Sequence, residues 1–223
     1  MIEFVFMLTR DDRTVDDAPE VLAALSGSGL RYVGFKDVGA APDRQRELTA
    51  RAHDLGMEVM LEVVSTSRED EAGSLRSARG AGVDWVLGGT NPDLGLEVLA
   101  GSGIRYCPFA GAVAGHPSVL GGDVDEIADH ARELTSRDGV AGVDLLTYRH
   151  PVADPEKLTA AVARAAAGVV IAAGSVVTDE QIALLARAGA WGFTIGSAVF
   201  DGSVPGRDVR ARIDRVLDVA AAC

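Results

Sequence analysis

Lysine is nearly absent from this sequence, so the position of each lysine is informative. The chain has 21 Lys and Arg residues, and only Lys36 and Lys157 are lysines. Lys36 stands near the end of the apolar run Tyr32–Val38, where its ammonium group would lose hydration. A lysine in a partly dry pocket can act as a general base or as the amine of a Schiff base. We therefore expect Lys36 to take part in catalysis and Lys157, in a polar stretch, to be solvated.

Two acidic residues are the expected partners of this lysine. Glu62 lies in the apolar run Glu58–Val64 and would be costly to bury without a partner. Because side chains alternate along a strand, Lys36 and Glu62 would meet if both face the same side of adjacent strands. The pair could then serve as acid and base in enolisation next to a carbonyl group, with Asp37 assisting. The alternative is a structural ion pair of Lys36 with Glu62 or Asp37.

Two apolar runs near the C-terminus end in the same dipeptide, Gly174-Ser175 and Gly196-Ser197. Glycine lets backbone N–H groups approach an anion closely, and the N-terminus of a following helix adds a favourable dipole. Gly174, Ser175, Gly196 and Ser197 are therefore predicted to bind a phosphate group without the help of Lys or Arg. The alternative is that each dipeptide only turns a strand into a helix.

Other polar residues follow apolar runs and could contact a substrate. Arg149 could bind a carboxylate or hydroxyl groups beside Tyr148, and His150 could shuttle a proton. His116 lies in a glycine-rich loop and could act when that loop closes over a substrate. Thr90 could bind a substrate hydroxyl. For each of these residues the alternative is an ordinary polar loop.

Short apolar runs rich in β-branched and aromatic residues recur along the chain, separated by amphipathic stretches. Eight strands alternating with helices indicate an open doubly wound sheet or a closed (β/α)8 barrel. The count of eight, the short uniform runs and the lack of G-x-G-x-x-G after the first run favour the barrel. We predict an α/β fold, a single (β/α)8 TIM barrel over residues 1–223, with the phosphate site on strands seven and eight. The runs are Glu3–Leu8, Tyr32–Val38, Glu58–Val64, Trp85–Gly89, Tyr106–Ala110, Gly142–Thr147, Val169–Ala173 and Gly192–Ile195.

Local signals indicate how the runs are connected. Thr178 and Gln181 have the spacing of a capping box at the start of a helix. Asp11 and Asp12 follow the first run and are expected to begin the first helix. The one long loop between a strand and a helix is predicted at Gly111–Gly122.

Composition excludes several classes of partner. Asp and Glu number 33, and the net charge is -12. This balance disfavours nucleic acid and anionic membranes, which need a basic face. Two cysteines and an acid near the N-terminus, where a signal peptide needs a basic start, favour a soluble cytoplasmic protein. The apolar helix faces of small barrels also allow a homo-oligomer.

No metal or cofactor is expected from the sequence. No ligand pair with the spacing of H-x-H or H-E-x-x-H occurs. A less favoured alternative brings Glu62, Asp37, His116 and His150 together around one metal ion.

The segment AAGSVVTDEQIALLARAGAWGFTIGSAVFDG resembles the last quarter of the ribulose-phosphate-binding barrels. This superfamily includes phosphosugar isomerases, epimerases, decarboxylases and aldolases. The resemblance lies at motif level over residues 169–202 and is architectural elsewhere, and it implies phosphate binding by the two Gly-Ser turns. The sequence lacks the D-x-K-x-x-D motif of the decarboxylase group, the strand-six lysine of the ketodeoxy-phosphogluconate aldolases and the paired strand histidines of the epimerases. No single reaction can therefore be transferred from the superfamily.

Three hypotheses about function follow. The leading one is an isomerase or epimerase that rearranges a phosphorylated sugar or polyol, in which Lys36 and Glu62 move protons and Asp37, Arg149 and His150 assist. The second is an aldolase or synthase in which Lys36 forms a Schiff base. The third is a non-catalytic protein that binds a phosphosugar.

Overall fold

A computed structural model describes residues 1–223 and contains the eight parallel strands expected from the sequence. Each observed strand coincides with one predicted apolar run. The strand ends at most three residues before the run does. The largest difference follows β7, because Pro108 has no N–H with which to continue the ladder. The strands are β1 (Glu3–Met7), β4 (Tyr32–Lys36), β5 (Glu58–Val63), β6 (Trp85–Gly88), β7 (Arg105–Cys107), β10 (Gly142–Leu145), β11 (Val169–Ala172) and β12 (Gly192–Ile195).

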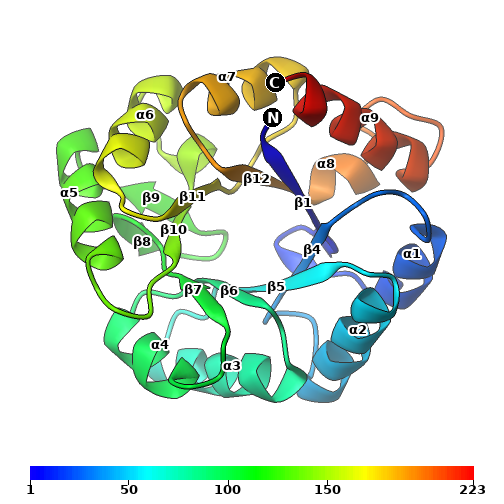
Figure 1. Cartoon of the computed structure of the whole chain (residues 1–223), viewed down its shortest axis with the longest axis horizontal. Helices are drawn as coiled ribbons and strands as arrows, with labels where there is room; N and C mark the ends of the chain where they lie inside the picture. Colours follow the sequence, from blue (N-terminus) through cyan, green and yellow to red (C-terminus); the bar gives the residue numbers. More distant parts are fainter.

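The strands close into a barrel (Figure 1). Their hydrogen-bonded order is β10-β11-β12-β1-β4-β5-β6-β7. The remaining seam between β7 and β10 is joined by parallel bridges from Tyr106 to Val140 and from Phe109 to Asp144. Across it, the Asp144 N–H donates to the Pro108 carbonyl at 2.9 Å. The prediction of a TIM barrel is therefore confirmed, and the carboxyl ends of all eight strands open on one face.

Helices form a ring around the barrel (Figure 1). The capping box predicted for α7 is present, because the Gln181 N–H donates to Thr178 Oγ1 at 3.3 Å and the Thr178 N–H donates to Gln181 Oε1 at 3.0 Å. None of the helices is long and apolar enough to cross a membrane. The helices are α1 (Ala18–Ala24), α2 (Pro42–Asp54), α3 (Arg68–Ala81), α4 (Pro92–Leu99), α5 (Val124–Thr135), α6 (Pro155–Ala165), α7 (Asp179–Arg187), α8 (Ser197–Phe200) and α9 (Val209–Ala222), with a 3-10 turn at Thr147–Arg149.

Strand alternation divides the core into two layers. On β4, Val33 and Phe35 pack outward against the helices, so Lys36 faces the barrel lumen. On β10, Val143 and Leu145 pack outward, so Asp144 faces the lumen as well. The ladder thus places charged groups inside an otherwise apolar barrel.

Aromatic side chains fill the amino-terminal end of the lumen. The rings of Tyr32 and Trp191 lie 5.4 Å apart, and those of Trp85 and Trp191 lie 5.5 Å apart. The guanidinium of Arg105 stacks 3.9 Å from the centre of the Trp85 ring. Because these residues stand at or before the first positions of their strands, the charged groups are reached from the carboxyl-terminal end.

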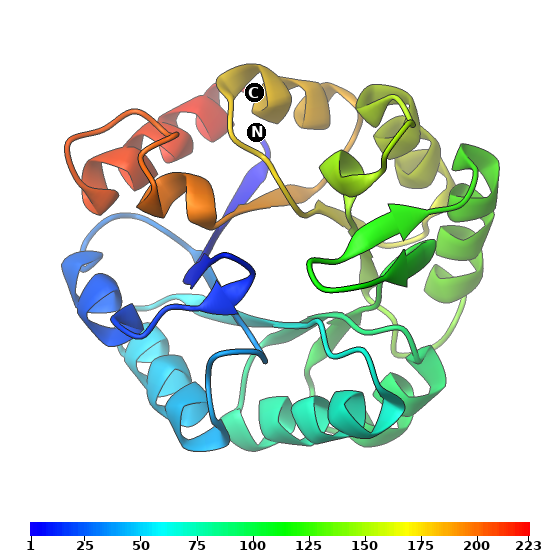
Figure 2. The same ribbon diagram turned by 180° about the vertical axis from the view of Figure 1, so that it is seen from behind.

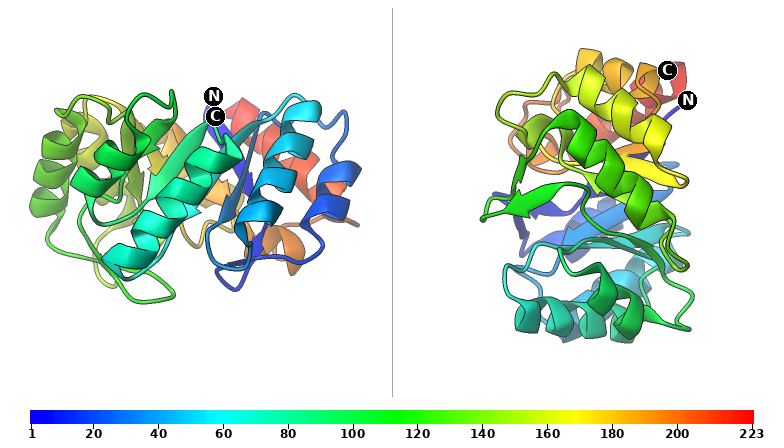
Figure 3. Two further views of the ribbon diagram at one scale, coloured as in Figure 1. Left: turned by 90° about the horizontal axis from the view of Figure 1, so that it is seen from below. Right: turned by 90° about the vertical axis from the view of Figure 1, so that its left-hand side faces the viewer.

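Two β-hairpins flank that carboxyl-terminal end (Figures 2 and 3). One joins β2 (Thr9–Arg10) to β3 (Arg13–Thr14), and the other joins β8 (Ala112–Ala114) to β9 (Val119–Gly121). The long connection predicted at Gly111–Gly122 does join a strand to a helix, from β7 to α5, and it contains the second hairpin, which the sequence analysis did not predict.

The expectation that Asp11 and Asp12 begin the first helix is also wrong. They form the two-residue turn of the first hairpin, with φ angles of 50° and 59°. Tight hairpins need this left-handed conformation at both turn positions, and aspartate tolerates it better than most residues. The turn directs the Asp12 side chain into the barrel mouth.

We predict that Thr14 holds the first hairpin on the barrel. Its hydroxyl donates to the Lys36 carbonyl at 2.8 Å and accepts the Lys36 N–H at 3.0 Å, both buried. Thr14→Val keeps the shape and leaves both backbone groups without these partners, so the free energy of unfolding, measured by urea denaturation, should fall by about 1–3 kcal/mol. Thr49→Val is the control, because its hydroxyl donates only to the Gln45 carbonyl inside α2. An equal loss in both variants would contradict a special role for Thr14.

Candidate active site

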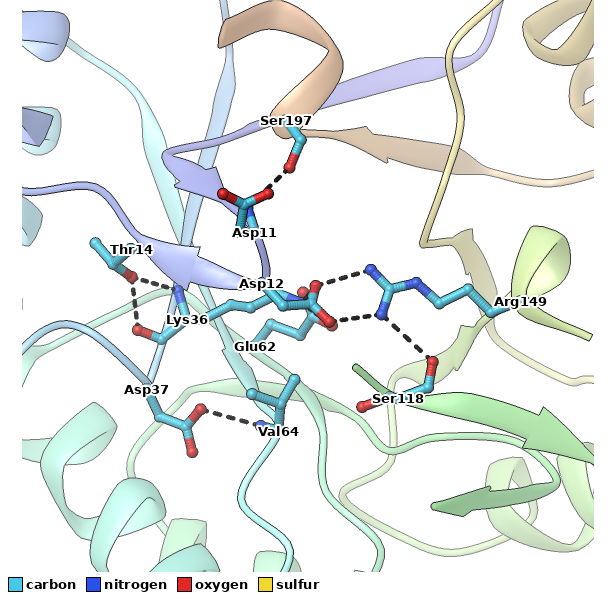
Figure 4. A network of polar contacts seen from close by, with 10 residues as sticks. All are labelled: Asp11, Asp12, Thr14, Lys36, Asp37, Glu62, Val64, Ser118, Arg149 and Ser197. Atoms are coloured by element: carbon cyan, nitrogen blue, oxygen red, sulfur yellow. Dashed lines mark hydrogen bonds and ion pairs between the residues drawn. The ribbon is translucent and has the colours of Figure 1, made fainter. Parts of the chain in front are cut away.

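A buried lysine lies at the centre of the barrel mouth. Lys36 is 4% exposed, and its Nζ lies 2.7 Å from Asp12 Oδ1 and 3.4 Å from Glu62 Oε1 (Figure 4). The contact with Glu62 follows from the ladder, because Lys36 and Glu62 are direct partners in the pairing of β4 with β5. The contact with Asp12 depends on the hairpin turn. The ammonium group therefore bridges two carboxylates from different parts of the fold.

Arg149 completes this group from the opposite side of the mouth. Its two terminal nitrogens donate to the two oxygens of Asp12, each at 2.7 Å (Figure 4). One of them also donates to the Ser118 carbonyl at 3.3 Å, in the second hairpin. A bidentate arginine–carboxylate pair fixes direction as well as distance. Arg149 therefore links both hairpins over the barrel mouth.

Burial and charge set the protonation states of this group. Burial by itself would lower the pKa of Lys36, but the carboxylates of Glu62 and Asp12 outweigh it and the pKa of Lys36 is raised. Burial alone would raise the pKa of Asp12, but hydrogen bonds from Arg149 and the charge of Lys36 hold that pKa well below its usual range. At neutral pH the resting site therefore contains an ammonium group against a carboxylate.

A further acid, Asp144, lies in the lumen without any partner. It is fully buried, and neither of its side-chain oxygens makes a hydrogen bond. Burial, and next the charge of Glu62, raise the pKa of Asp144 well above its usual range. An ionised carboxylate in such surroundings would be very costly, so burial favours the protonated form of Asp144.

One cavity of about 220 Å³ joins the charged group to the two Gly-Ser turns. It is lined by Asp12, Lys36, Glu62 and Arg149 on one side and by the turns on the other. At the first turn Gly174 and Ser175 have φ angles of 78° and 61°. The backbone N–H groups of Gly174, Ser175 and Val176 make no hydrogen bond within the protein. The turns after β11 and β12 thus lie beside Lys36, with backbone donors left over.

Asp37 does not join this group. Its carboxylate accepts the Val64 N–H at 3.1 Å (Figure 4). It also accepts the Ser74 hydroxyl at 2.8 Å and the Ser65 hydroxyl. Lys36 and Asp37 are adjacent in sequence and therefore point to opposite sides of the chain. Asp37 instead joins the end of β4 to the end of β5 and to α3.

The predicted substrate-binding and proton-shuttling residues other than Arg149 lie away from the cavity. His150 Nε2 contacts the Gly122 carbonyl at 2.9 Å, and its Nδ1 accepts the Ala153 N–H at 2.8 Å. The Tyr148 hydroxyl points to a carbonyl of α7, and Thr90 bonds to Glu71. His116 is exposed, at the tip of the second hairpin. The structure also does not bring Glu62, Asp37, His116 and His150 together around one point, as the metal alternative required.

Sequence reasoning missed two residues of the site. Asp12 was assigned to a helix start, although the Asp11-Asp12 pair after a strand is also a signal for a tight hairpin turn. Asp144 has a clearer signal, because it is an acid inside the apolar run Gly142–Thr147, as Glu62 is in its own run. The same argument from the cost of burial applies to both acids.

Solved structures share this fold at low sequence identity. The native KDPGal structure is 14% identical with a TM-score of 0.66, covering 100% of this chain and 96% of that one. The orotidine 5'-phosphate decarboxylase of Pyrococcus horikoshii is 13% identical with a TM-score of 0.67, covering 98% and 99%. The YdjI aldolase of Escherichia coli is 12% identical with a TM-score of 0.61, covering 99% and 89%.

These solved structures share the TIM-barrel fold of this chain. No family model matches the chain, and no curated protein matches it. Identities of this size establish the architecture alone, so the reaction must be argued from the site.

We predict that Asp144 makes stability fall as pH rises. The folded protein keeps the Asp144 proton at pH values where the unfolded chain has released it. The contribution of this group to the free energy of unfolding is therefore complete below its pKa in the unfolded chain, about 4, and is lost as the pH rises above that value. Asp144→Asn has no titratable group at this position, so its free energy of unfolding does not fall with pH for this reason. Its free energy of unfolding, relative to that of the unmodified protein, should rise between about pH 5 and pH 8, by up to about 1.4 kcal/mol per pH unit.

Urea denaturation at several pH values measures this difference. Asp218→Asn, at an exposed side chain without a hydrogen bond or ion pair, is the control and should keep a constant offset. A constant offset for Asp144→Asn as well would show that Asp144 is ionised in the folded protein.

Proposed function

We propose that this protein is an enzyme that rearranges a small phosphorylated sugar or polyol by proton transfer next to a carbonyl, as an isomerase or epimerase. One observation carries the proposal: the Lys36–Glu62 pair and the two Gly-Ser turns line the same cavity. The cavity is smaller than the range of about 300–1,000 Å³ typical of ligand pockets, which favours a substrate with few carbon atoms. Similar folds among the solved structures include aldolases and a nucleotide decarboxylase, which supports an enzyme and leaves the reaction open.

The turns after β11 and β12 would hold the phosphate. The N–H groups of Gly174, Ser175 and Val176 are free to donate, and left-handed φ angles at the first two point successive N–H groups toward one side. Ser197 lies across the cavity, where its hydroxyl accepts the Asp11 N–H at 3.2 Å and ties the first hairpin to the phosphate end. A phosphate held here leaves the carbon chain to extend toward Lys36.

Lys36 and Glu62 would then carry out the chemistry. The Lys36 ammonium donates a hydrogen bond to the substrate carbonyl oxygen. Glu62 takes the proton from the adjacent carbon, and the electron pair of that C–H bond forms the enediolate, whose oxygen Lys36 stabilises. Return of the proton from Glu62 to the neighbouring carbon, with proton exchange between the two oxygens, completes an isomerisation. Asp12 orients the ammonium group, and Arg149 orients Asp12.

A lyase is the second candidate, because aldolases are among the proteins of this fold. In its Schiff-base form, the Lys36 amine must be neutral to attack a carbonyl, and the two carboxylates raise its pKa instead. Borohydride reduction in the presence of a ketose phosphate separates the two reactions. A covalent adduct on Lys36 would favour the lyase, and binding without any turnover would favour a non-catalytic phosphosugar-binding protein.

We predict that the two lysines differ sharply in importance. Lys36→Met keeps the volume of the stem and removes the amine, so the rate should fall by about 10²-fold or more, the usual loss of acid–base catalysis. Lys157→Met, at an exposed helix position, should leave the rate unchanged. Proton NMR in heavy water measures the rate, as loss of the signal next to the carbonyl of ketose phosphates. Full exchange activity in a folded Lys36→Met variant would defeat the proposal.

The phosphate site is best tested at Ser175. A side chain at Gly174 would meet Arg149 Nε at 2.6 Å, and one at Gly196 would meet the Thr9 carbonyl at 2.9 Å, so substituted glycines would disturb the structure. Ser175 is exposed, and Asp and Asn both tolerate its left-handed conformation. We expect Ser175→Asp to weaken binding of inorganic phosphate by about 10-fold or more, a cost of 1.4 kcal/mol, through charge repulsion.

Ser175→Asn is the matched control, since it differs from the aspartate variant only in charge. It should bind phosphate nearly as the unmodified protein does in isothermal titration calorimetry. Equal affinity of the two variants would remove the assignment of phosphate to this turn.

A further inference from the structure

The charged groups that line the cavity indicate which substrates it accepts. Five such residues surround it, two cations and three carboxylates: Lys36, Arg149, Asp12, Glu62 and Asp201. A substrate with a second anionic group would need a cation that is free to meet it. Such a substrate can therefore bind only if Lys36 or Arg149 has a donor that the protein's own carboxylates do not occupy.

Neither cation is free. Both terminal nitrogens of Arg149 are held by Asp12 at 2.7 Å, and one of them also donates to the Ser118 carbonyl. Lys36 lies between Asp12 and Glu62 and is itself 4% exposed. Two buried cations therefore face two buried carboxylates, and this group is electrically balanced.

The other acidic residues near the cavity do not make the binding of a further anion more favourable. Asp144 is buried without a hydrogen-bond partner, which favours its uncharged form, and it supplies no cation in either form. The Asp201 carboxylate accepts the Ser203 N–H at 2.9 Å and remains at the rim, so it would repel a further anion. A carboxylate placed beside Lys36 would leave the buried group with one uncompensated negative charge, which a low dielectric makes costly.

We propose that the substrate carries a single phosphate as its only anionic group, and that Asp12 excludes substrates whose reacting end bears a carboxylate. The inference rests on the proposed function and narrows it to neutral phosphorylated sugars and polyols. The reacting end of such a substrate offers hydroxyl and carbonyl groups, which can share Lys36 and Arg149 with the carboxylates without disturbing the charge balance. Asp12 is in this view a residue that determines specificity.

A matched pair of ligands tests the inference. Glycerol 3-phosphate and 3-phosphoglycerate differ only in a hydroxymethyl group against a carboxylate. In isothermal titration calorimetry at neutral pH, the unmodified protein should bind glycerol 3-phosphate at least about 10-fold more tightly, which corresponds to 1.4 kcal/mol. Equal binding, or tighter binding of 3-phosphoglycerate, would overturn the inference and leave the phosphate site intact. Failure of both ligands to bind would overturn the proposed function and this inference with it.

Asp12→Asn tests the stated role of the carboxylate. The change frees Arg149, and asparagine tolerates the left-handed conformation of this turn. The ratio of the affinity for 3-phosphoglycerate to that for glycerol 3-phosphate should rise at least about 10-fold in the variant relative to the unmodified protein. Asp11→Asn, at the neighbouring exposed position of the same turn, is the control and should keep the original preference. No gain in Asp12→Asn, or the same gain in Asp11→Asn, would show that Asp12 does not set the specificity.

Discussion

The buried ammonium group of Lys36 is the constraint on which the rest of the site depends. A lysine with 4% exposure is tolerable only with opposite charges in contact, and two carboxylates supply them. One comes from the neighbouring strand, and the other comes from a hairpin turn. Asp12 in turn needs Arg149, because one ammonium group does not satisfy both of its oxygens. The hairpins and the sheet are therefore tied together through charges at the mouth of the barrel.

The same arrangement fixes the positions of the charged groups. The Thr14 hydroxyl bonds to both backbone groups of Lys36, so the hairpin that carries Asp12 is fixed directly to the strand that carries the lysine. Groups held in this way need little reorganisation when charge develops on a substrate oxygen. Asp144, in contrast to Lys36, has no partner in the lumen. Its burial raises its pKa, which favours the protonated form.

The proposed phosphate site needs few special residues. At the turn after β11, backbone N–H groups without a partner in the protein would be the donors, and this suits a chain with only two lysines. In the proposed function the charged residues at the other end of the cavity carry out the chemistry. Phosphate affinity and reactivity would then depend on different parts of the barrel, an arrangement that lets one architecture host many reactions.

The strands and the start of α7 were readable from local patterns, because alternation and capping act over a few residues. The sequence also predicted that Lys36 and Glu62 would meet, since a charge in an apolar run must have a partner, and the structure places both beside the Gly-Ser turns in one cavity. Only the tertiary structure decided which partners those are. Asp37 was the nearest acid in sequence, yet strand alternation points it away, whereas Asp12 and Arg149 meet across 137 positions. His150 was predicted to shuttle a proton and His116 to act on a bound substrate, but the loop geometry that directs a side chain depends on long-range packing, which no local pattern encodes.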